Sequence, residues 1–278
     1  MADRGAARRG AAFSGRRMSP GKVLLVATSA LLLLLLGLPL LVLAGQGIAT
    51  QGWRDMPDSG VPEAILLSLL TTLTSAALIA LLGTPLAYIL ARWRFPWRTA
   101  LIVLVELPIV LPPAVAGLAL LLTFGRRGPF GPLLEGLGIS LPFSTAAVVL
   151  AQTFVAAPYF IRSAQVGFQG VSPEIEAAAR VDGAAGLTLL RHVTLPLASH
   201  ALGSGLVLSW ARALGEFGAT ILFAGSLSGR TQTMPLLVYG VFERNIDAAI
   251  WTGLLLLGMA LAALLLSQWL TRKAPPIN

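Results

Sequence analysis

The chain has 278 residues, of which 56% are hydrophobic and only 12% are charged. Soluble domains carry about 25% charged residues, so a mean hydropathy of +0.80 indicates an integral membrane protein. The length allows one helical membrane domain and no sizeable soluble domain. The sequence contains no cysteine, which excludes disulfides, thiolate metal sites and cysteine nucleophiles.

Six stretches are apolar over the length that a membrane-spanning helix needs, about 20 residues. No sustained alternation of apolar and polar residues predicts strands, so we expect an all-α polytopic membrane protein with six transmembrane helices. The first stretch follows a basic tail, and its apolar core is longer than that of a signal peptide, which favours a retained span over cleavage after Ala44. The predicted spans are residues 23–44, 64–90, 100–123, 144–164, 200–224 and 248–270.

The positive charges predict how the chain is oriented in the membrane. With the N-terminus inside, the inner segments hold fourteen of the 20 Lys and Arg residues, and the outer loops hold five. Because cytoplasmic loops carry the excess of Lys and Arg, both termini are predicted to be cytoplasmic. The net charge of +8 then reflects orientation, and we expect no binding to nucleic acid. The predicted parts are a basic cytoplasmic tail (1–22), a first span with its outer loop (23–63), a main transmembrane domain (64–270) with a cytoplasmic loop at 165–196, and a second cytoplasmic tail (271–278).

Residues 172–196 read SPEIEAAARVDGAAGLTLLRHVTLP and are more organised than a connector requires. Ser172 is a good N-cap, proline suits the first helical position, and two glutamates favour the positive end of the helix dipole. We expect a two-turn helix that stops at Asp182-Gly183, where glycine allows a positive φ, and then a second short helix at about 184–192. Leu195-Pro196 is expected to turn the chain back into the membrane, because the residue before proline avoids the α region.

The first of these helices carries small residues between charged ones. Small side chains permit close approach of another backbone, so we interpret the helix as a rigid docking element for another protein. The alternative is an amphipathic helix on lipid, which is disfavoured because the segment lacks a strong apolar face with basic flanks. The small residues are Ala177, Ala178 and Ala179.

Glu176-Ala177-Ala178, Gly183 and Leu195-Pro196 at this spacing resemble the EAA loop of ABC importer permeases. The resemblance implies a coupling helix that sits in a groove of a separate cytoplasmic ATPase and transmits ATP-driven closure to the spans. It also implies a polar contact between Glu176 and the ATPase. The residues expected to couple to the ATPase are Glu176, Ala177, Ala178, Asp182, Gly183 and Pro196.

The chain is not expected to bind ATP itself. Its nearest approach to a phosphate-binding loop, residues 15–23, has one residue too many and no Ser or Thr after the lysine. We therefore expect no cofactor in this chain and ATP use by a partner subunit. Neither a metal site nor a catalytic residue is expected.

Arg212 and Glu216 lie four residues apart in the fifth predicted span, on one face of the helix. Ionisable residues inside a membrane cost about 2.5–3.5 kcal/mol each on insertion scales and are candidates for function. One interpretation is a buried ion pair that holds helices together. The other places Arg212 beside a water-filled path, where it lowers the barrier for an anion. The sequence leaves both open.

Glycines and prolines mark further candidates for a translocation pathway. Gly215 and Gly218 permit close helix crossing, with flexibility at a gate as the alternative. Three prolines in the third span bend the helix, and broken helices at membrane depth commonly line a pathway. Glu106 is expected to reach toward water or to pair with Arg98. The candidate pathway or gate residues are Arg212, Glu216, Gly218, Thr220, Pro112 and Pro113.

Four threonine and serine residues of the second span are expected to form interhelical hydrogen bonds, with a role in a pore as the alternative. They are Thr71, Thr72, Thr74 and Ser75.

Four segments extend the resemblance to molybdate ABC transporter permeases, over about residues 64–270. They are ELPIVLPPAVAGLALLLTFGRRG, the EAA loop, ARALGEFGATILFAG and GRTQTMPLLVY. Tungstate and sulfate or thiosulfate permeases share much of this pattern, and the last two segments favour molybdate. The resemblance implies the ABC importer permease fold (MetI-like) in the cytoplasmic membrane of a prokaryote.

The resemblance also implies partners. Two permease chains would form the pathway at their interface, two ATP-binding subunits would drive it, and a periplasmic or surface-anchored oxyanion-binding protein would dock on the outer loops. There it would meet Arg126, Arg127, Thr231 and Gln232, for which ordinary solvated loop polarity is the alternative. An intramembrane enzyme would need a convergent Asp, His and Lys cluster, and a gradient-driven secondary transporter would tend to show inverted repeats and midplane carboxylates. Neither pattern is evident.

Overall fold

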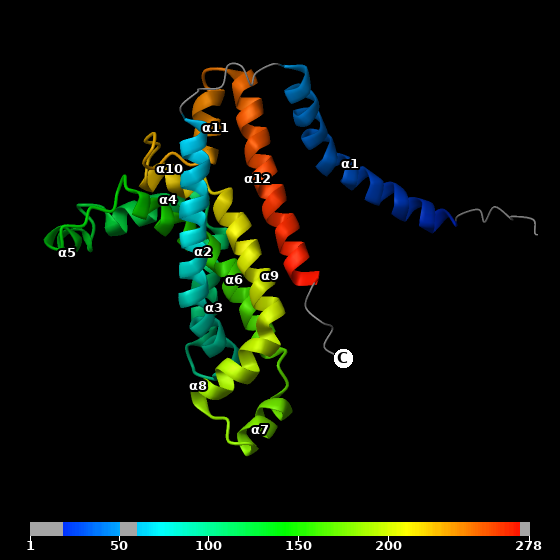
Figure 1. Ribbon diagram of the computed structural model, residues 1–278, viewed down its shortest axis with the longest axis vertical. Coiled ribbons are helices and arrows are strands. Elements are labelled where there is room, and N and C mark those ends of the chain that lie inside the picture. Colours follow the sequence, from blue (N-terminus) through cyan, green and yellow to red (C-terminus); the bar gives the residue numbers. More distant parts are fainter. Residues whose placement is uncertain (1–18, 51–59, 273–278) are drawn as a thin grey trace, which may run out of the picture. The chain divides into compact units, whose positions relative to one another are not determined.

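The computed structural model describes residues 19–50 and 60–272. Within these residues the regular secondary structure is entirely helical, which confirms the all-α prediction. Helix α1, Pro20–Ala49, is a long apolar helix in a unit of its own (Figure 1). The second unit contains α2 (Val61–Arg92), α3 (Arg98–Val110), α4 (Pro113–Phe124), α5 (Gly131–Gly136), α6 (Thr145–Gln169), α7 (Pro173–Val181), α8 (Gly186–Leu189), the π-helical turn η2 (Leu190–Thr194), α9 (Leu195–Leu214), α10 (Gly218–Phe223), α11 (Met234–Phe242) and α12 (Ile246–Arg272).

Four described helices, α1, α2, α6 and α12, are long and apolar enough to cross a membrane. They coincide with the first, second, fourth and sixth predicted spans. Helices α3 and α4 meet the same criteria only as a pair, and they are bent by 116° where they join. The fifth predicted span is divided into α9 and the short α10. Two predicted spans are thus broken helices, and the count of six membrane crossings stays a prediction.

The break between α3 and α4 follows from two consecutive prolines. Leu111 and Pro112 both have an extended backbone, with ψ of 131° and 133°, as residues that precede a proline prefer. Pro113 then occupies the first turn of α4, where a missing N–H leaves no hydrogen bond unmade. Pro108 lies inside α3 without ending it. The predicted bend is confirmed and lies at Leu111-Pro112.

Helix α6 is the centre of the second unit, packed against α2 and α9 (Figure 1). Small residues allow the close approach of α6 and α9. A Cβ added to Gly205 would lie 2.5 Å from the Cβ of Ser163. A Cβ added to Gly167 would lie 2.5 Å from the Cβ of Ala201. The apolar core between these helices and α2 includes Ile79, Ala87, Leu90, Ala156, Phe160 and Phe168.

The pieces of the two broken spans, α4 and α10, cross each other closely. A Cβ added to Gly117 would lie 2.7 Å from the carbonyl oxygen of Ala219, and one added to Gly218 would lie 2.5 Å from the Cβ of Pro113. The packing interpretation of Gly218 is therefore confirmed. Gly215 has no such neighbour, since its nearest atom lies 3.9 Å away in the preceding turn. Close crossing does not explain Gly215, which follows the last residue of α9 as its C-cap.

We expect Gly218→Ala to destabilise the folded chain and Gly215→Ala to be tolerated. An added methyl at position 218 would overlap the ring of Pro113, which cannot rotate away, and overpacking of this kind costs about 1–3 kcal/mol. The thermal unfolding midpoints of the two purified variants in detergent provide the measurement. Equal midpoints would contradict the close crossing of α4 and α10.

The connection between α7 and α9 differs from the prediction. The second loop helix was expected at about 184–192, but α8 covers Gly186–Leu189 alone and is continued by the π-helical turn Leu190–Thr194. Leu195 is α-helical, with φ of −64° and ψ of −46°, so the predicted turn at Leu195-Pro196 is wrong. A wide π turn before a proline keeps the chain helical, because it relieves the clash between the proline ring and the preceding turn.

Candidate functional site

Helix α7 begins and ends as its sequence predicts. The hydroxyl of Ser172 accepts a hydrogen bond from the N–H of Glu174 at 3.2 Å, and Pro173 occupies the first position. Gly183 follows the helix with φ of +90°, a conformation that favours glycine. The Ser172 hydroxyl also bonds the carboxylate of Glu174, and this bond holds the pKa of Glu174 below its usual value. Glu174 is therefore charged at neutral pH, near the positive end of the helix.

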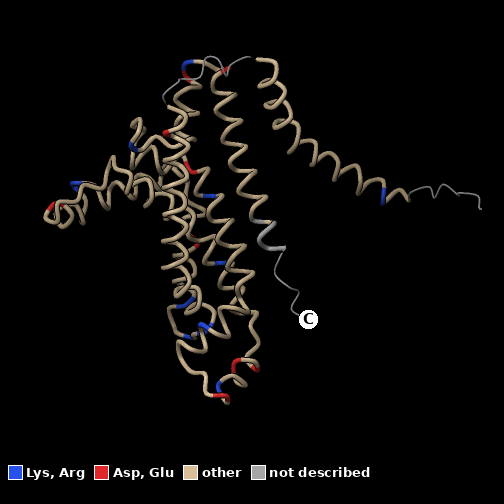
Figure 2. Tube along the Cα trace, in the orientation of Figure 1, with Lys and Arg blue, Asp and Glu red and all other residues tan. Residues whose placement is uncertain are grey.

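The outward face of α7 combines small and apolar side chains. Ala177, Ala178, Asp182 and Gly183 are all exposed, and Val181 is 89% exposed. Charged residues are sparse along the long helices and gather around α7 (Figure 2). A single exposed apolar residue is common on protein surfaces, so it is the combination of Val181 with the exposed small residues of a capped helix that suits this face to a protein contact. Sequence analysis missed Val181, although an apolar residue beside Asp182-Gly183 was a signal for it.

Glu176 points to the interior of the chain. Only 4% of the residue is exposed, and its Oε1 accepts hydrogen bonds from Arg92 Nη2 at 2.8 Å and from Thr194 Oγ1 at 2.9 Å. Arg180 approaches its other oxygen at 3.6 Å. Arg92 also donates to the carbonyl oxygen of Val171 at 3.0 Å. The Glu176–Arg92 pair thus joins the end of α2, the residues before α7, α7 itself and the turn that leads into α9.

This arrangement changes the role expected of Glu176. We expected its carboxylate to meet the ATPase, but the structure turns it toward Arg92 and Thr194, because a buried carboxylate needs charged and hydrogen-bonding partners. Ala177, Ala178 and Gly183 remain available on the outside. The exposed and buried faces of α7 are therefore suited to different tasks, contact with another protein and attachment to the membrane helices.

Arg212 and Glu216 form an ion pair at the break between α9 and α10. Arg212 Nη1 lies 2.7 Å from Glu216 Oε2, and the side chain of Glu216 is 1% exposed. The other oxygen of Glu216 accepts a hydrogen bond from the N–H of Ala219 at 2.8 Å, in the first turn of α10. The guanidinium side chain of Arg212 is 27% exposed. Glu216 therefore holds the break together, while Arg212 keeps an accessible side.

The structure brings together most of the candidate pathway residues where the two broken spans meet. Gly218 lies against Pro113, and Pro112 is the adjoining residue of the other break. Thr220 is fully buried in α10, and its hydroxyl has no hydrogen-bond partner in the described part of the chain. Among the described residues, no three His, Asp or Glu side chains are placed to hold a metal ion.

The structure gives Glu106 and Arg98 separate partners. Glu106 pairs with Arg162 of α6 at 2.8 Å, whereas Arg98 donates to the carbonyl oxygen of Leu90 at 2.8 Å. Of the two alternatives for Glu106, the pair with Arg98 is therefore wrong, and the side chain pairs with Arg162 while it stays 35% exposed. Arg162, which the charge count grouped with the inner loop, lies within α6, because that helix extends to Gln169.

The hydroxyls of the second span make mostly local bonds. Thr71, Thr72 and Thr74 each donate to a carbonyl oxygen one turn earlier in α2, which corrects the expectation of interhelical hydrogen bonds for Thr71 and Thr74 but not for Thr72. Thr72 nevertheless accepts a hydrogen bond from Trp210 Nε1 of α9 at 3.0 Å. Ser75 donates to the carbonyl oxygen of Val149 in α6 at 3.0 Å, as predicted. The hydroxyl protons of the three threonines are thus donated to carbonyl oxygens of their own helix.

The outer segments expected to meet a binding protein contain one buried residue. Thr231 is fully buried, and its hydroxyl accepts from the N–H of Leu227 at 2.9 Å and donates to the carbonyl oxygen of Gly225 at 3.2 Å. It shapes its own loop and is not available for contact. Arg126 and Arg127 are exposed, and Gln232 is partly exposed.

Comparison with known proteins identifies a family of membrane transport components. The family of binding-protein-dependent transport system inner membrane components matches residues 83–274. A molybdenum transport system permease protein of Mycobacterium tuberculosis is 44% identical over 223 residues, which cover 80% of this chain and 84% of that protein. A sulfate transport system permease protein of Synechococcus elongatus is 37% identical over 221 residues, which cover 79% of this chain and 77% of that protein.

The fold is shared with a solved transporter. The crystal structure of a bacterial ABC transporter involved in the import of the acidic polysaccharide alginate aligns with a TM-score of 0.73 at 17% identity, covering 92% of this chain and 96% of that chain. The family match includes both broken spans and the loop that carries α7. The chain therefore belongs to the family of binding-protein-dependent transport system inner membrane components, and it is a transport subunit of the ABC importer type rather than an enzyme.

Proposed function

We propose that this chain is the permease subunit of an ATP-driven importer that passes a tetrahedral oxyanion across the cytoplasmic membrane by alternating access. The substrate that we propose is molybdate. The substrate class is supported by relatives named for molybdenum and for sulfate transport, because molybdate and sulfate are both divalent tetrahedral anions. The higher identity to the molybdenum permease, 44% against 37%, favours molybdate. Tungstate and sulfate are the alternatives.

The proposed assembly contains an ATP-binding subunit against α7, a periplasmic or surface-anchored oxyanion-binding protein at the opposite end of the membrane helices, and a second copy of the permease. ATP is proposed to act in the ATP-binding subunit. The excess of Lys and Arg on one side supports cytoplasmic termini and a cytoplasmic α7.

The observation that carries the proposal is the two-sided construction of α7. Its outer face offers Ala177, Ala178 and the exposed Val181 to a partner. Its inner face is tied through Glu176 to Arg92 at the end of α2 and to Thr194 before α9. A displacement of α7 by the ATPase is therefore passed to two membrane helices at once.

The broken spans are the proposed location of the pathway. Helix α9 ends at the Arg212–Glu216 pair, and α10 crosses α4 beside the Leu111-Pro112 break. Interrupted helices place unpaired backbone groups and helix ends at membrane depth, where they can face a passing ion. The partly exposed guanidinium of Arg212 is suited to compensate the charge of an oxyanion, while Glu216 fixes its position.

Competition for uptake tests the substrate. The assay reconstitutes the complete complex in proteoliposomes and measures uptake of labelled molybdate in the presence of unlabelled molybdate, tungstate or sulfate. We expect molybdate and tungstate to compete more strongly than sulfate. Strongest competition by sulfate would reassign the substrate within the oxyanions, and absence of oxyanion uptake by the intact complex would overturn the proposal.

A further inference from the structure

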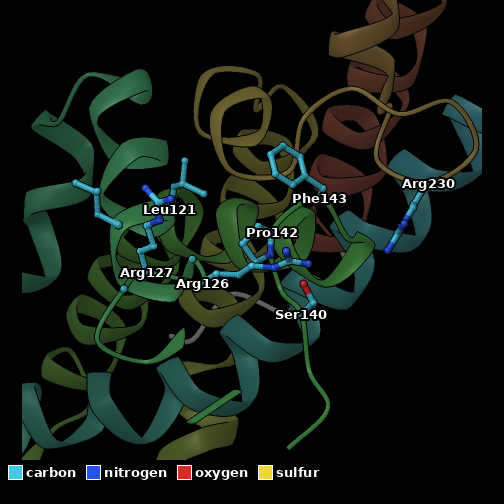
Figure 3. A pocket seen from close by; sticks show the side chains of 10 residues that line it. Leu121, Arg126, Arg127, Ser140, Pro142, Phe143 and Arg230 are labelled. Carbon is cyan, nitrogen blue, oxygen red and sulfur yellow. The ribbon is translucent and has the colours of Figure 1, made fainter. Parts of the chain in front are cut away.

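A cavity of about 630 Å³ lies where α4, the start of α6 and the loop between α10 and α11 meet. Three arginines from two distant segments line it, together with the hydroxyl-bearing Ser140 (Figure 3). Arg126 extends across the cavity toward Pro142 and Ser140, and Arg127 and Arg230 stand to either side of it (Figure 3). The remaining lining is mainly apolar. Neither the family nor the proposed coupling mechanism explains this concentration of positive charge.

The charge of these arginines is poorly compensated. Arg126 Nε lies 3.7 Å from Glu135 Oε1, but both side chains are more than half exposed, so the pair is weak. In the part of the chain that the structure describes, no carboxylate lies within salt-bridge distance of Arg127 or Arg230. Guanidinium groups present planar pairs of donors that match the oxygens of a tetrahedral anion. A concave surface with one sign of charge also concentrates ions of the opposite sign.

The backbone around the cavity is held firmly. The N–H of Gly128 bonds the carbonyl oxygen of Gly125 at 2.8 Å, which closes a tight turn around Arg126 and Arg127. On the other side, Thr145 Oγ1 at the start of α6 donates to the carbonyl oxygen of Arg230 at 2.9 Å. The arginines are therefore mounted on fixed supports rather than on free loops.

Phe143, at the rim of the cavity, has a φ of +60°, a conformation that costs a residue other than glycine about 1–3 kcal/mol and is found disproportionately at functional sites. Its N–H donates to the carbonyl oxygen of Phe223, the last residue of α10, at 3.3 Å. Helix α10 begins beside the Arg212–Glu216 pair. The cavity thus lies at one end of α10, and the membrane-embedded ion pair lies at the other.

The cavity is at the opposite end of α6 from the coupling loop. Helix α6 begins at Thr145, beside the cavity, and ends at Gln169, shortly before α7. Its length of about 37 Å, at 1.5 Å per residue, is enough to separate the two faces of a membrane. With α7 in the cytoplasm, the cavity opens on the outer face.

We propose that this cavity, the three-arginine cavity, is a receiving site for the oxyanion as it leaves the binding protein, before it reaches Arg212. The inference rests on the proposed function, because it takes the substrate to be an oxyanion. A site of exposed, solvated arginines holds its ligand weakly. Weak binding suits a site from which the ion must move on toward the inside. The ligand class is a divalent tetrahedral oxyanion.

The test uses the complete complex with its binding protein and labelled molybdate as the probe. The variant is Arg126→Gln, Arg127→Gln and Arg230→Gln combined. Arg244→Gln is the control, since Arg244 is exposed in the connection after α11 and does not line the cavity. Uptake rates are measured over a range of concentrations of molybdate-loaded binding protein, together with the ATP hydrolysis that the binding protein stimulates.

We expect the triple variant to lower the maximum uptake rate by about tenfold or more, through the loss of hydrogen bonds to a charged ligand. The half-saturating concentration of binding protein and the stimulated ATP hydrolysis should stay close to those of the control. Unchanged uptake would overturn the receiving site. A raised half-saturating concentration with an unchanged maximum would also overturn it, because the arginines would then dock the binding protein. If the unaltered complex takes up no oxyanion, the proposed function itself fails.

Discussion

Glu176→Lys is expected to abolish ATP-driven uptake while the chain still inserts into the membrane. The lysine would place a third positive charge beside Arg92 and Arg180, where the structure has a buried carboxylate with three polar partners, Arg92, Arg180 and Thr194. Removing one partner of a buried ion pair costs about 3–5 kcal/mol. That cost displaces α7 from the end of α2, since the membrane helices pack elsewhere through their own apolar cores.

Glu174→Lys is the matched control for this variant. It makes the same change of charge on the same helix, two residues away, at an exposed position. We expect near-normal uptake and near-normal co-purification with the ATPase for Glu174→Lys and loss of both for Glu176→Lys. Normal uptake and co-purification by Glu176→Lys would contradict the assignment of α7 as the coupling helix.

Arg92→Gln separates the inward role of Glu176 from a direct contact with the ATPase. If Glu176 acts by joining α7 to α2, loss of its partner at 2.8 Å should reproduce most of the uptake defect. If Glu176 instead reaches the ATPase, the arginine variant should couple normally. Because Arg92 belongs to α2 and lies outside α7, a defect in co-purification by Arg92→Gln indicates that α7 is positioned from within the permease.

The second large effect is expected at the intramembrane ion pair. Arg212→Met should reduce both folded yield and uptake, since it leaves the 1%-exposed carboxylate of Glu216 without its cation. A buried charge without its partner costs about 3–5 kcal/mol. The double variant Arg212→Met, Glu216→Gln removes that unpaired charge, and the amide can still accept the hydrogen bond from the N–H of Ala219.

The double variant therefore distinguishes the two interpretations of Arg212. We expect it to recover folded yield, measured by size-exclusion chromatography in detergent, but to remain at least about tenfold below the unaltered protein in anion uptake, because a cation beside the path would be missing. Recovery of both yield and uptake would show that the pair only holds the helices together. The single and double variants differ only at Glu216, so a difference between them in yield or uptake arises from this ion pair.

Local features of the sequence predicted much of the local structure, although the preference of residues before proline failed at Leu195-Pro196, where the chain stays helical. The cap at Ser172, the stop at Gly183 and the bend before Pro113 follow from backbone preferences that act within a few residues, and all three are present. The Arg212–Glu216 pair follows from the spacing of four residues along a helix. These elements could be predicted because the cause and its effect lie in one segment.

Contacts between distant segments could not be predicted in the same way. Glu176 and Arg92 are separated by 84 residues, and Trp210 and Thr72 by 138. Nothing in a single sequence indicates which of several arginines will reach a given carboxylate, so Arg98 was named as one alternative for Glu106, whereas Arg162 is its partner. The three-arginine cavity was missed for the same reason, because its members come from two loops that meet only in the folded chain.

We propose that a separate ATPase drives this permease through α7. The most direct test measures accumulation of labelled molybdate in proteoliposomes that contain the permease and the ATP-binding subunit, with binding protein outside. We predict that accumulation requires ATP in the lumen, stops with vanadate and disappears in the Glu176→Lys variant. Accumulation driven by a proton or sodium gradient, with the ATP-binding subunit left out, would contradict ATP-driven transport through α7.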